Sequence, residues 1–269
     1  MSILLVGAGR MGSALLKGWL GRGVKSIAVV EPKPSAELRR LGRTKKIALF
    51  ATPFATPSLV KRKPSVCVVA IKPQVLKGEA EALAGFAQSG ALMISIAAGT
   101  SVAALSAAWG KKSRIVRAMP NTPGSIGHGI TGLYAARGVT AADKKRAVSL
   151  LSALGQTEWV AKEEMIDSVT AVSGSGPAYL FLMAEALTEA GIAEGLPRAQ
   201  AEKFARATVA GAGALLAADK APASALREAV TSPGGTTAAA LTVLMADDGL
   251  VQLMKRAVKA ARQRAEELR

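Results

Sequence analysis

The sequence is poor in the residues that most often build metal sites and hydrolytic centres. It has one cysteine and one histidine among 269 residues. The single Cys67 excludes a disulfide framework, and its place in the apolar run 65–71 predicts a small core side chain. Because His128 is the only histidine, a Cys/His metal site and a Ser-His-Asp triad are both disfavoured, and no metal is expected. We interpret His128 as structural.

Acidic residues are few, 19 against 35 basic ones, which leaves a formal net charge of +16. Such a charge suits a nucleic-acid partner. The basic residues, however, are scattered and are not interleaved with aromatic side chains in a recognition motif. Solvated helix faces, or attraction for an anionic cofactor and substrate, explain them more simply, so no nucleic-acid partner is expected. The basic clusters are Lys61–Lys63, Lys111–Lys112, Lys144–Arg146 and Lys255–Arg264.

One charge-free stretch, Ala91–Trp109, has the length of a membrane span. Gly99-Thr100-Ser101 divides it into a strand and a capped helix, as in a strand–helix unit, so no membrane segment is expected. No positively charged leader precedes the first strand, which begins after Ser2. These features predict a soluble protein of a reducing compartment, the cytoplasm.

Short apolar strands alternate with helical segments through the first half of the chain. Near-continuous apolar strands separated by helices are typical of a parallel sheet covered on both faces, which predicts an α/β domain over residues 1–162. Two edge strands, Ile130–Ala135 and Thr157–Val160, are expected to flank a helix that begins at the capping box Thr140–Asp143. The other expected strands are Ile3–Val6, Ser26–Val30, Val66–Ile71, Leu92–Ile96 and Arg114–Ala118, with helices at Arg10–Leu20 and Ser35–Leu41.

Beyond Glu163 the strand pattern ends, and an all-α domain is expected over residues 163–269. Alanine is abundant and aromatic residues are only 4%, which favours closely packed helices. Small residues in Val209–Leu216 permit close helix contact. Because no long linker precedes these helices, we expect their Ala-rich faces to pack against a second subunit; a compact monomeric domain is the alternative. The expected helices are Ala178–Ala190, Arg198–Ala218, Ala223–Val230, Thr236–Met245 and Leu250–Leu268.

A glycine-rich loop, Gly7-Ala8-Gly9-Arg10-Met11-Gly12, follows the first strand and opens the first helix. Gly7 permits a tight turn, Gly9 lets the backbone approach a pyrophosphate, and Gly12 allows close helix–strand packing. Because the motif lies within a strand–helix–strand unit, it predicts a dinucleotide site in a Rossmann-type domain.

The residues after the second strand give conflicting signals about the dinucleotide. Glu31 stands where an acidic residue binds the ribose hydroxyls of NAD, and its charge should repel the 2′-phosphate of NADP. Lys33, Arg39 and Arg40 are placed to pair with that phosphate, or else they form a solvated basic face. From these residues alone, the choice between NADPH and NADH stays open.

Further loops end strands at the edge where ligands bind in open α/β sheets. Ala70-Ile71-Lys72-Pro73 brings Lys72 to that edge, where it is placed to touch cofactor or substrate. In Arg117–Pro123, Asn121 offers hydrogen bonds to a nicotinamide or a substrate, and a plain proline-rich turn is the alternative. A Gly/Ser-rich loop, Ala171–Tyr179, leads into a helix and by itself predicts only a helix start.

The segment 230–237, Val-Thr-Ser-Pro-Gly-Gly-Thr-Thr, predicts an anion cradle. Pro233 presets a turn, and two glycines let the backbone approach a ligand closely. Two hydroxyl residues follow at the start of a helix, where unpaired N–H groups and the helix dipole suit a carboxylate or phosphate. Taken alone, the segment is more simply interpreted as a capped helix after a turn.

Together these motifs make the chain resemble the pyrroline-5-carboxylate reductase family over its full length. Their order and spacing match as well, and the last of them is the family's most specific motif. They are the glycine loop at 7–12, Ala-Ile-Lys-Pro at 70–73, Met-Pro-Asn-Thr-Pro at 119–123, Ser-Gly-Ser-Gly-Pro-Ala-Tyr at 173–179 and Thr-Ser-Pro-Gly-Gly-Thr-Thr at 231–237.

The resemblance implies an enzyme that transfers a hydride from NAD(P)H to the C=N carbon of 1-pyrroline-5-carboxylate, giving proline. NADPH is the expected cofactor, with NADH as the alternative. An N-terminal Rossmann domain, a C-terminal helical dimerisation domain, and interlocked dimers that in many members form decamers are also implied. The substrate pocket of such dimers combines two subunits. A protonated imine is already a good electrophile, so the lack of a catalytic histidine agrees with this chemistry.

The resemblance also implies roles for particular residues. Thr237 would hydrogen-bond near the ring nitrogen and help protonate the imine, and Lys72 is the second candidate catalytic residue. The N–H groups of Gly235 and Thr236 would hold the substrate carboxylate. The expected substrate-binding residues are Val230, Ser232, Gly234, Gly235, Thr236 and Thr237; the expected cofactor-binding residues are Gly7, Ala8, Gly9, Arg10, Met11, Gly12, Glu31, Lys33, Ala70, Ile71, Lys72, Pro73 and Asn121.

The chain departs from the family pattern at two places that concern the cofactor. Near Thr52–Ser58 many members carry an Asn close to the adenosine, whereas this chain has Ala-Thr-Pro-Ser. Glu31 differs from the Ser- or Arg-containing turns of NADPH-preferring members.

The rival enzyme is another imine or β-hydroxyacid reductase of the same two-domain plan, for which Lys203 is the candidate catalytic lysine. A non-catalytic dinucleotide-binding regulator is a further alternative, and the intact 231–237 motif argues against it.

Overall fold

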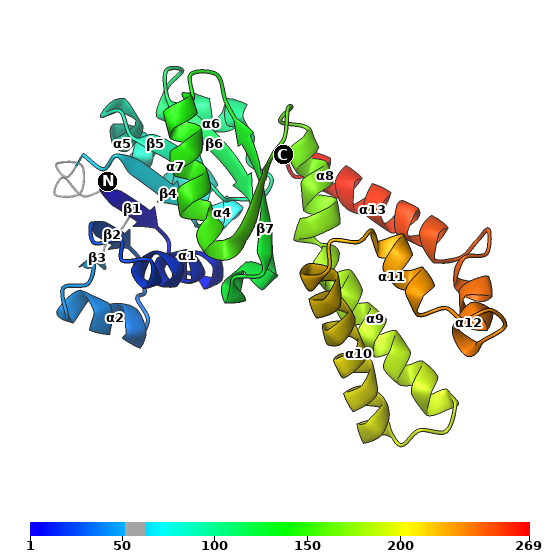
Figure 1. Cartoon of the computed structure of the whole chain (residues 1–269). Helices are drawn as coiled ribbons and strands as arrows, with labels where there is room; N and C mark the ends of the chain where they lie inside the picture. Colours follow the sequence, from blue (N-terminus) through cyan, green and yellow to red (C-terminus); the bar gives the residue numbers. More distant parts are fainter. Residues whose placement is uncertain (52–62) are drawn as a thin grey trace. The chain divides into compact units, whose positions relative to one another are not determined.

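The computed structural model describes residues 1–51 and 63–269. The chain forms two compact units (Figure 1). One comprises residues 1–174 together with 261–269, and the other comprises residues 175–260. The division at residue 162 proposed from the sequence stays a prediction. Among the described helices, none combines the length and apolarity that a bilayer crossing requires.

The first unit is built on a sheet whose described strands run in the order β3-β2-β1-β4-β5-β6-β7-β8. Neighbouring strands are parallel except β6 and β7, which are antiparallel. The strand order reverses between β1 and β4, and ligands bind at such a reversal in open α/β sheets. The strands are β1 (Ile3–Val6), β2 (Ile27–Val30), β3 (Ala48–Phe50), β4 (Val66–Val69), β5 (Leu92–Ser95), β6 (Arg114–Met119), β7 (Gly129–Ala135) and β8 (Gly155–Trp159).

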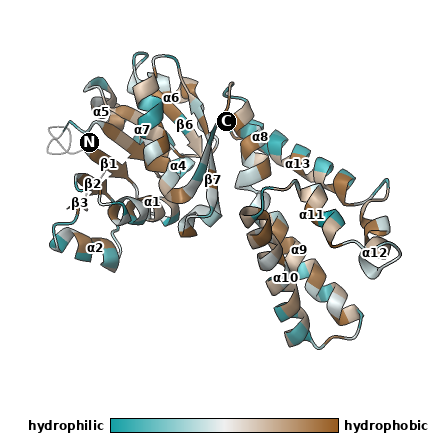
Figure 2. Ribbon diagram, viewed as in Figure 1, coloured by the Kyte–Doolittle hydropathy of each residue, from teal (hydrophilic) through white to brown (hydrophobic). Residues whose placement is uncertain are grey.

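Helices cover both faces of this sheet, as the apolar strands require. Alternate residues of each central strand point to opposite faces, and Figure 2 shows the hydrophobic colouring concentrated on these strands. One core packs around Leu15 and Trp19, and the other around Phe86 and Trp109. The helices of this unit are α1 (Arg10–Gly21), α2 (Ala36–Arg43), α4 (Pro73–Glu79), α5 (Ala84–Gln88), α6 (Val102–Trp109), α7 (Ala141–Leu151) and α8 (Met165–Val169).

Two expectations about the sheet need correction, and one strand was missed. β7 lies between β6 and β8 and is not an edge strand; the edges are β8 and β3. β3 was not predicted, because three half-buried residues give no measurable alternation. β4 ends at Val69, so Ala70 lies just beyond the strand. Cys67 is fully buried in β4 as expected, and burial raises the pKa of its thiol.

Apart from a bend at Ser175, the Gly/Ser-rich segment 171–179 is helical and is not a loop. A π-helical turn, Thr170–Gly174, continues α8 and leads into α9 (Gly176–Ala193). The hydroxyl of Ser173 donates to the Val169 carbonyl at 3.0 Å, and the hydroxyl of Thr170 donates to the Ile166 carbonyl at 2.8 Å. Such bonds to the preceding turn let Ser and Thr remain inside a helix, which composition alone did not reveal.

The second unit consists of helices with long apolar side chains on their surfaces. After α9 come α10 (Arg198–Ala218), α11 (Ala223–Ala229), α12 (Thr236–Leu244) and the first part of α13 (Leu250–Glu267). Leu180, Phe181 and Phe204 are each more than half exposed. Exposed apolar surface of this extent on a helical unit is typical of a subunit interface.

Candidate cofactor and substrate sites

The glycine loop lies at the reversal of strand order, where packing requires two of its glycines. Gly7 has φ +87°, and a Cβ there would lie 2.6 Å from the Ile71 side chain. A Cβ on Gly12 would strike the Gly7 carbonyl oxygen and lie 3.3 Å from the Ala70 side chain. Loops 7–12 and 70–73 therefore pack closely against each other.

Gly9 differs from these two glycines, because a Cβ built on it would meet no protein atom within 4 Å. It caps α1 without a side-chain hydrogen bond to the helix N–H groups. By contrast, side chains of Ser35, Ser101 and Thr140 cap α2, α6 and α7. The uncapped start of α1, with open space over Gly9, fits the pyrophosphate of a dinucleotide.

Glu31 braces the glycine loop, a contact that the sequence did not reveal. Its Oε2 accepts a hydrogen bond from the Ala8 N–H at 2.8 Å, and its Oε1 accepts one from the Lys33 N–H at 3.1 Å. Of the basic residues considered for a 2′-phosphate, Arg40 pairs with Glu37 at 2.9 Å on the surface. Lys33 and Arg39 are exposed.

Lys72 and Asn121 follow strands that end at the same edge of the sheet. Lys72 is exposed and caps α4, and Pro73 occupies the first turn of that helix. The Asn121 Oδ1 accepts a hydrogen bond from the Ile130 N–H at 3.0 Å. This bond ties the 3-10 turn Thr122–Ile126 to β7, and it gives the amide oxygen of Asn121 a structural role.

In the second unit, the segment 230–237 forms the expected turn before α12. Gly234 has φ +70°, which favours glycine. The Gly235 N–H donates to the Ser232 carbonyl at 3.0 Å, and Gly235, the N-cap residue of α12, makes no side-chain hydrogen bond to the helix. The Gly235 N–H, expected to bind the substrate carboxylate together with that of Thr236, is instead engaged within the turn. Thr236 and Thr237 supply the first N–H groups that lack an intrahelical acceptor.

Two further contacts fix the shape of this turn. The Thr231 hydroxyl donates to the Arg227 carbonyl at 2.6 Å, which joins the turn to α11. A Cβ on Gly235 would strike the Ser232 side-chain oxygen. Val230 is 65% exposed and Thr237 is half-buried. The simpler interpretation of a side-chain-capped helix does not apply, because α12 has no such cap.

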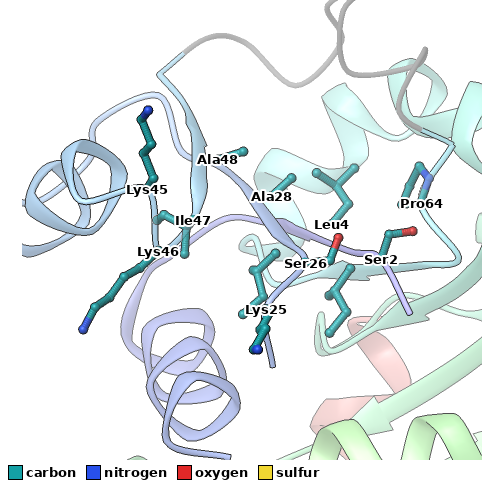
Figure 3. A pocket seen from close by; sticks show the side chains of 12 residues that line it. Ser2, Leu4, Lys25, Ser26, Ala28, Lys45, Lys46, Ile47, Ala48 and Pro64 are labelled. Carbon is teal, nitrogen blue, oxygen red and sulfur yellow. The ribbon is translucent and has the colours of Figure 1, made fainter. Parts of the chain in front are cut away.

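A cavity of about 450 Å³ lies elsewhere, at the amino ends of β1, β2 and β3 (Figure 3). Lys25, Lys45 and Lys46 line it, and Figure 3 shows their side chains pointing in different directions. The cavity contains no residue of the glycine loop or of the other ligand motifs. Because ligands in open α/β sheets bind at the carboxyl ends of the strands, we place the functional site at the opposite edge.

Residues considered for other roles lie at the surface or outside the described residues. Lys203 and His128 are exposed. The departure at Thr52–Ser58 falls outside the described residues. Within residues 1–51 and 63–269, no three His, Cys, Asp or Glu side chains are grouped to hold a metal ion.

Comparison with known proteins identifies the family. Residues 163–268 match the family model described as pyrroline-5-carboxylate reductase dimerisation, and residues 2–99 match NADP oxidoreductase coenzyme F420-dependent. The chain is 39% identical to the pyrroline-5-carboxylate reductase of Pseudomonas aeruginosa, over 99% of this chain and 96% of the relative. The chain belongs to the pyrroline-5-carboxylate reductase family. The Mycobacterium leprae reductase is 37% identical, with the same coverage of both chains.

Solved structures of pyrroline-5-carboxylate reductases agree in fold. The Coxiella burnetii reductase superposes with a TM-score of 0.89 at 36% identity, covering 99% of this chain and 98% of that one. A Plasmodium falciparum pyrroline carboxylate reductase with NADP bound gives a TM-score of 0.79 at 26% identity, covering 100% and 98%. These matches establish a Rossmann-type domain followed by helices, an NAD(P)H cofactor and a domain for self-association.

Proposed function

We propose that this chain reduces 1-pyrroline-5-carboxylate to L-proline with NAD(P)H, the last step of proline biosynthesis. The observation that carries the proposal is the uncapped start of α12 behind the turn 230–237. The start of α12 offers backbone N–H groups to a carboxylate, and the substrate of this reductase family carries a carboxylate. A bound nicotinamide cofactor supplies the hydride. The residues of the chain supply position, charge complementarity and one hydroxyl.

In the first unit, the residues fit a dinucleotide. The start of α1 at Arg10 and Met11 would hold the pyrophosphate, because Gly9 leaves that space open and no side chain competes for the helix N–H groups. Glu31 holds the loop in this conformation through the Ala8 N–H. Ala70 and Lys72 border the loop at the sheet edge, and the Asn121 NH₂ group faces the nicotinamide in this proposal.

In the second unit, the turn would hold the substrate. The N–H groups of Thr236 and Thr237 bind the carboxylate, assisted by the positive end of the α12 dipole. The Thr237 hydroxyl hydrogen-bonds the ring nitrogen and orients the protonated imine for hydride attack on the C=N carbon. Gly234 and Gly235 keep the backbone accessible, since a side chain at either position would strain or block the turn.

Replacing Thr237 with alanine is expected to lower turnover of pyrroline-5-carboxylate by more than tenfold without unfolding the protein. The loss corresponds to roughly one hydrogen bond of the transition state, more than 1.4 kcal/mol. Steady-state kinetics with saturating cofactor measure the effect. Thr242→Ala is the matched control, because Thr242 lies on the same helix and its hydroxyl donates to the Ala238 carbonyl. Equal rates for Thr237→Ala and wild type would remove the assigned role.

Replacing Lys33 with alanine tests which cofactor the turn after β2 accommodates. If Lys33 pairs with a 2′-phosphate, the variant should raise the KM for NADPH about tenfold and leave that for NADH unchanged. Arg43→Ala, a basic residue on α2 outside the proposed contact, serves as the control for net charge. Equal weakening of both cofactors would reject the pairing.

Two further proposals concern where the enzyme acts and how its subunits assemble. We propose a cytoplasmic enzyme whose dimers assemble further, as in decamers. Its exposed apolar helices are the surfaces that self-association would cover. The rival β-hydroxyacid reductase would need Lys203 at its catalytic centre; Lys203→Ala should therefore leave pyrroline reduction unchanged.

A further inference from the structure

A charged cluster in the first unit joins four segments that are far apart in the sequence. Arg117 of β6 is only 1% exposed, and its Nη1 lies 3.2 Å from the Glu163 Oε1. Its Nη2 lies 3.5 Å from the Asp167 Oδ1 of α8. The same Glu163 oxygen accepts a hydrogen bond from the Val102 N–H, 2.7 Å away, at the start of α6. The cluster therefore connects β6, α6 and α8.

The fourth member of the cluster is Arg269, the last residue described. Its Nη1 lies 3.2 Å from the Asp167 Oδ2, and Figure 1 shows the C-terminus beside α8. The neighbouring Leu268 carbonyl lies 2.8 Å from the position that a Cβ on Gly99 would occupy, and Gly99 has φ +64°. The end of α13 is therefore seated against the segment before α6.

The charges of this cluster balance only when Arg269 is present. Arg117 and Arg269 supply two positive charges, and Glu163 and Asp167 supply two negative ones. Asp167 is 1% exposed, and neither of its carboxylate oxygens accepts a hydrogen bond within the described part of the chain. Ion pairing alone compensates this buried carboxylate, and removing one partner leaves a buried charge uncompensated.

Arg117 stands four residues before Asn121, on the strand that delivers Asn121 to the cofactor edge. A Cβ on Gly174, in the π-helical turn that continues α8, would lie 2.8 Å from the end of the Met119 side chain. Arg117, through its ion pair with Asp167, and Met119, through its packing on Gly174, therefore both join β6 to the segment 167–174.

We propose that Arg269 is a positioning residue, which acts through Asp167 and Arg117 to hold the carboxyl end of β6 for cofactor binding. The proposal rests on the proposed function, because it takes the Asn121 loop as part of the cofactor site. Without Arg269, Asp167 draws Arg117 more strongly, and β6 settles in a less suitable position. Affinity for the reduced cofactor should fall, while the hydride transfer itself should change little.

The test measures NADPH binding by fluorescence, without substrate, for wild type and variants of the full chain. Arg269→Ala should weaken NADPH binding five- to tenfold, with kcat within twofold of wild type. Arg269→Lys, which restores the charge, should recover most of the affinity. The matched control is Arg264→Ala, because Arg264 lies on the same helix and pairs with Glu267 on the exposed surface at 2.7 Å. It should bind NADPH as wild type does.

A second variant separates positioning from general stability. In the Arg269→Ala background, Asp167→Asn removes the uncompensated charge and should lower the NADPH dissociation constant of that variant. A lowered melting temperature for Arg269→Ala with unchanged NADPH affinity would overturn the proposal, as would affinity that Arg269→Lys fails to restore. Wild-type turnover of pyrroline-5-carboxylate is measured in the same preparations. NADPH binding that depends on Arg269, in a protein that reduces no pyrroline, would reject the proposed function alone.

Discussion

Replacing Gly9 with alanine is expected to weaken cofactor binding by about 30-fold or more and to leave the fold intact. A Cβ at Gly9 meets open space in the protein, so the methyl group costs the folded chain little. The same methyl group would occupy the place where the backbone approaches the pyrophosphate. Steric exclusion of about 2 kcal/mol corresponds to this loss of affinity. Titration with NADPH and NADH, together with thermal unfolding, measures the two effects.

Gly12→Ala is the matched comparison, because its Cβ would strike the Gly7 carbonyl oxygen within the protein. That variant should lower the free energy of unfolding by about 1–3 kcal/mol. The two substitutions are thus distinguished by what they change. Gly9→Ala should lower cofactor affinity, and Gly12→Ala should lower the stability of the fold. Wild-type cofactor affinity in Gly9→Ala would contradict the placement of the pyrophosphate at the start of α1.

Replacing Asp143 with asparagine is expected to cost about 3 kcal/mol of stability at pH 7. Its buried carboxylate accepts hydrogen bonds from the Arg114 Nη1 at 2.7 and 2.9 Å. It also accepts bonds from the backbone N–H and hydroxyl of Thr140, at 3.1 and 2.8 Å. The amide keeps one acceptor oxygen but replaces the other with an NH₂ donor, and it leaves the Arg114 guanidinium without the negative charge of its partner. Chemical denaturation measures the difference in unfolding free energy.

The stability difference between wild type and Asp143→Asn is also expected to depend on pH, in a direction that the pKa of Asp143 determines. Burial by itself would raise the pKa of the Asp143 carboxyl, but the hydrogen bonds from Thr140 and Arg114 outweigh it and lower that pKa. A carboxyl whose pKa is lowered in the fold contributes stability above its unfolded pKa of about 3.9, and the contribution is lost as pH falls through the folded value. The stability difference between wild type and Asp143→Asn should therefore shrink below about pH 4.

An exposed pair provides the control for this experiment. Glu37 and Arg40 form an ion pair on α2 with side chains 68% and 57% exposed. Because water screens such a pair, Glu37→Gln should change the free energy of unfolding by less than about 0.5 kcal/mol. A difference for Asp143→Asn that stays constant from pH 7 to pH 3 would show that the charge of Asp143 does not stabilise the fold.

The sequence predicted those parts of the fold that local pattern determines. Apolar runs of four or more residues specified most central strands, and the Thr140–Asp143 pattern correctly placed the capping box of α7. β3 and the helix α4 gave too few periodic positions to be recognised. The π-helical turn at Thr170–Gly174 was missed, because hydrogen bonding to the preceding turn, and not composition, keeps its hydroxyl residues helical.

The candidate sites were predictable in their motifs and less so in their hydrogen bonds. The spacing of glycines predicted the loop at 7–12, and the structure places it against Ala70. Tertiary contacts decided what the polar side chains do. Glu31 binds the Ala8 N–H, and Asn121 binds the Ile130 N–H, and both contacts join residues brought together only by folding. The engagement of Gly235 with Ser232 likewise follows from turn geometry.

The most direct test of the proposed reaction follows the hydride itself. Purified protein is incubated with 1-pyrroline-5-carboxylate and a reduced nicotinamide cofactor deuterated at both C4 positions, and the product is analysed by mass spectrometry and NMR. We expect L-proline with one deuterium on the carbon that formed the C=N bond, produced with oxidised cofactor in equal amount. Proline without deuterium, or no proline with either NADPH or NADH, would contradict the assignment of this chain as a pyrroline-5-carboxylate reductase.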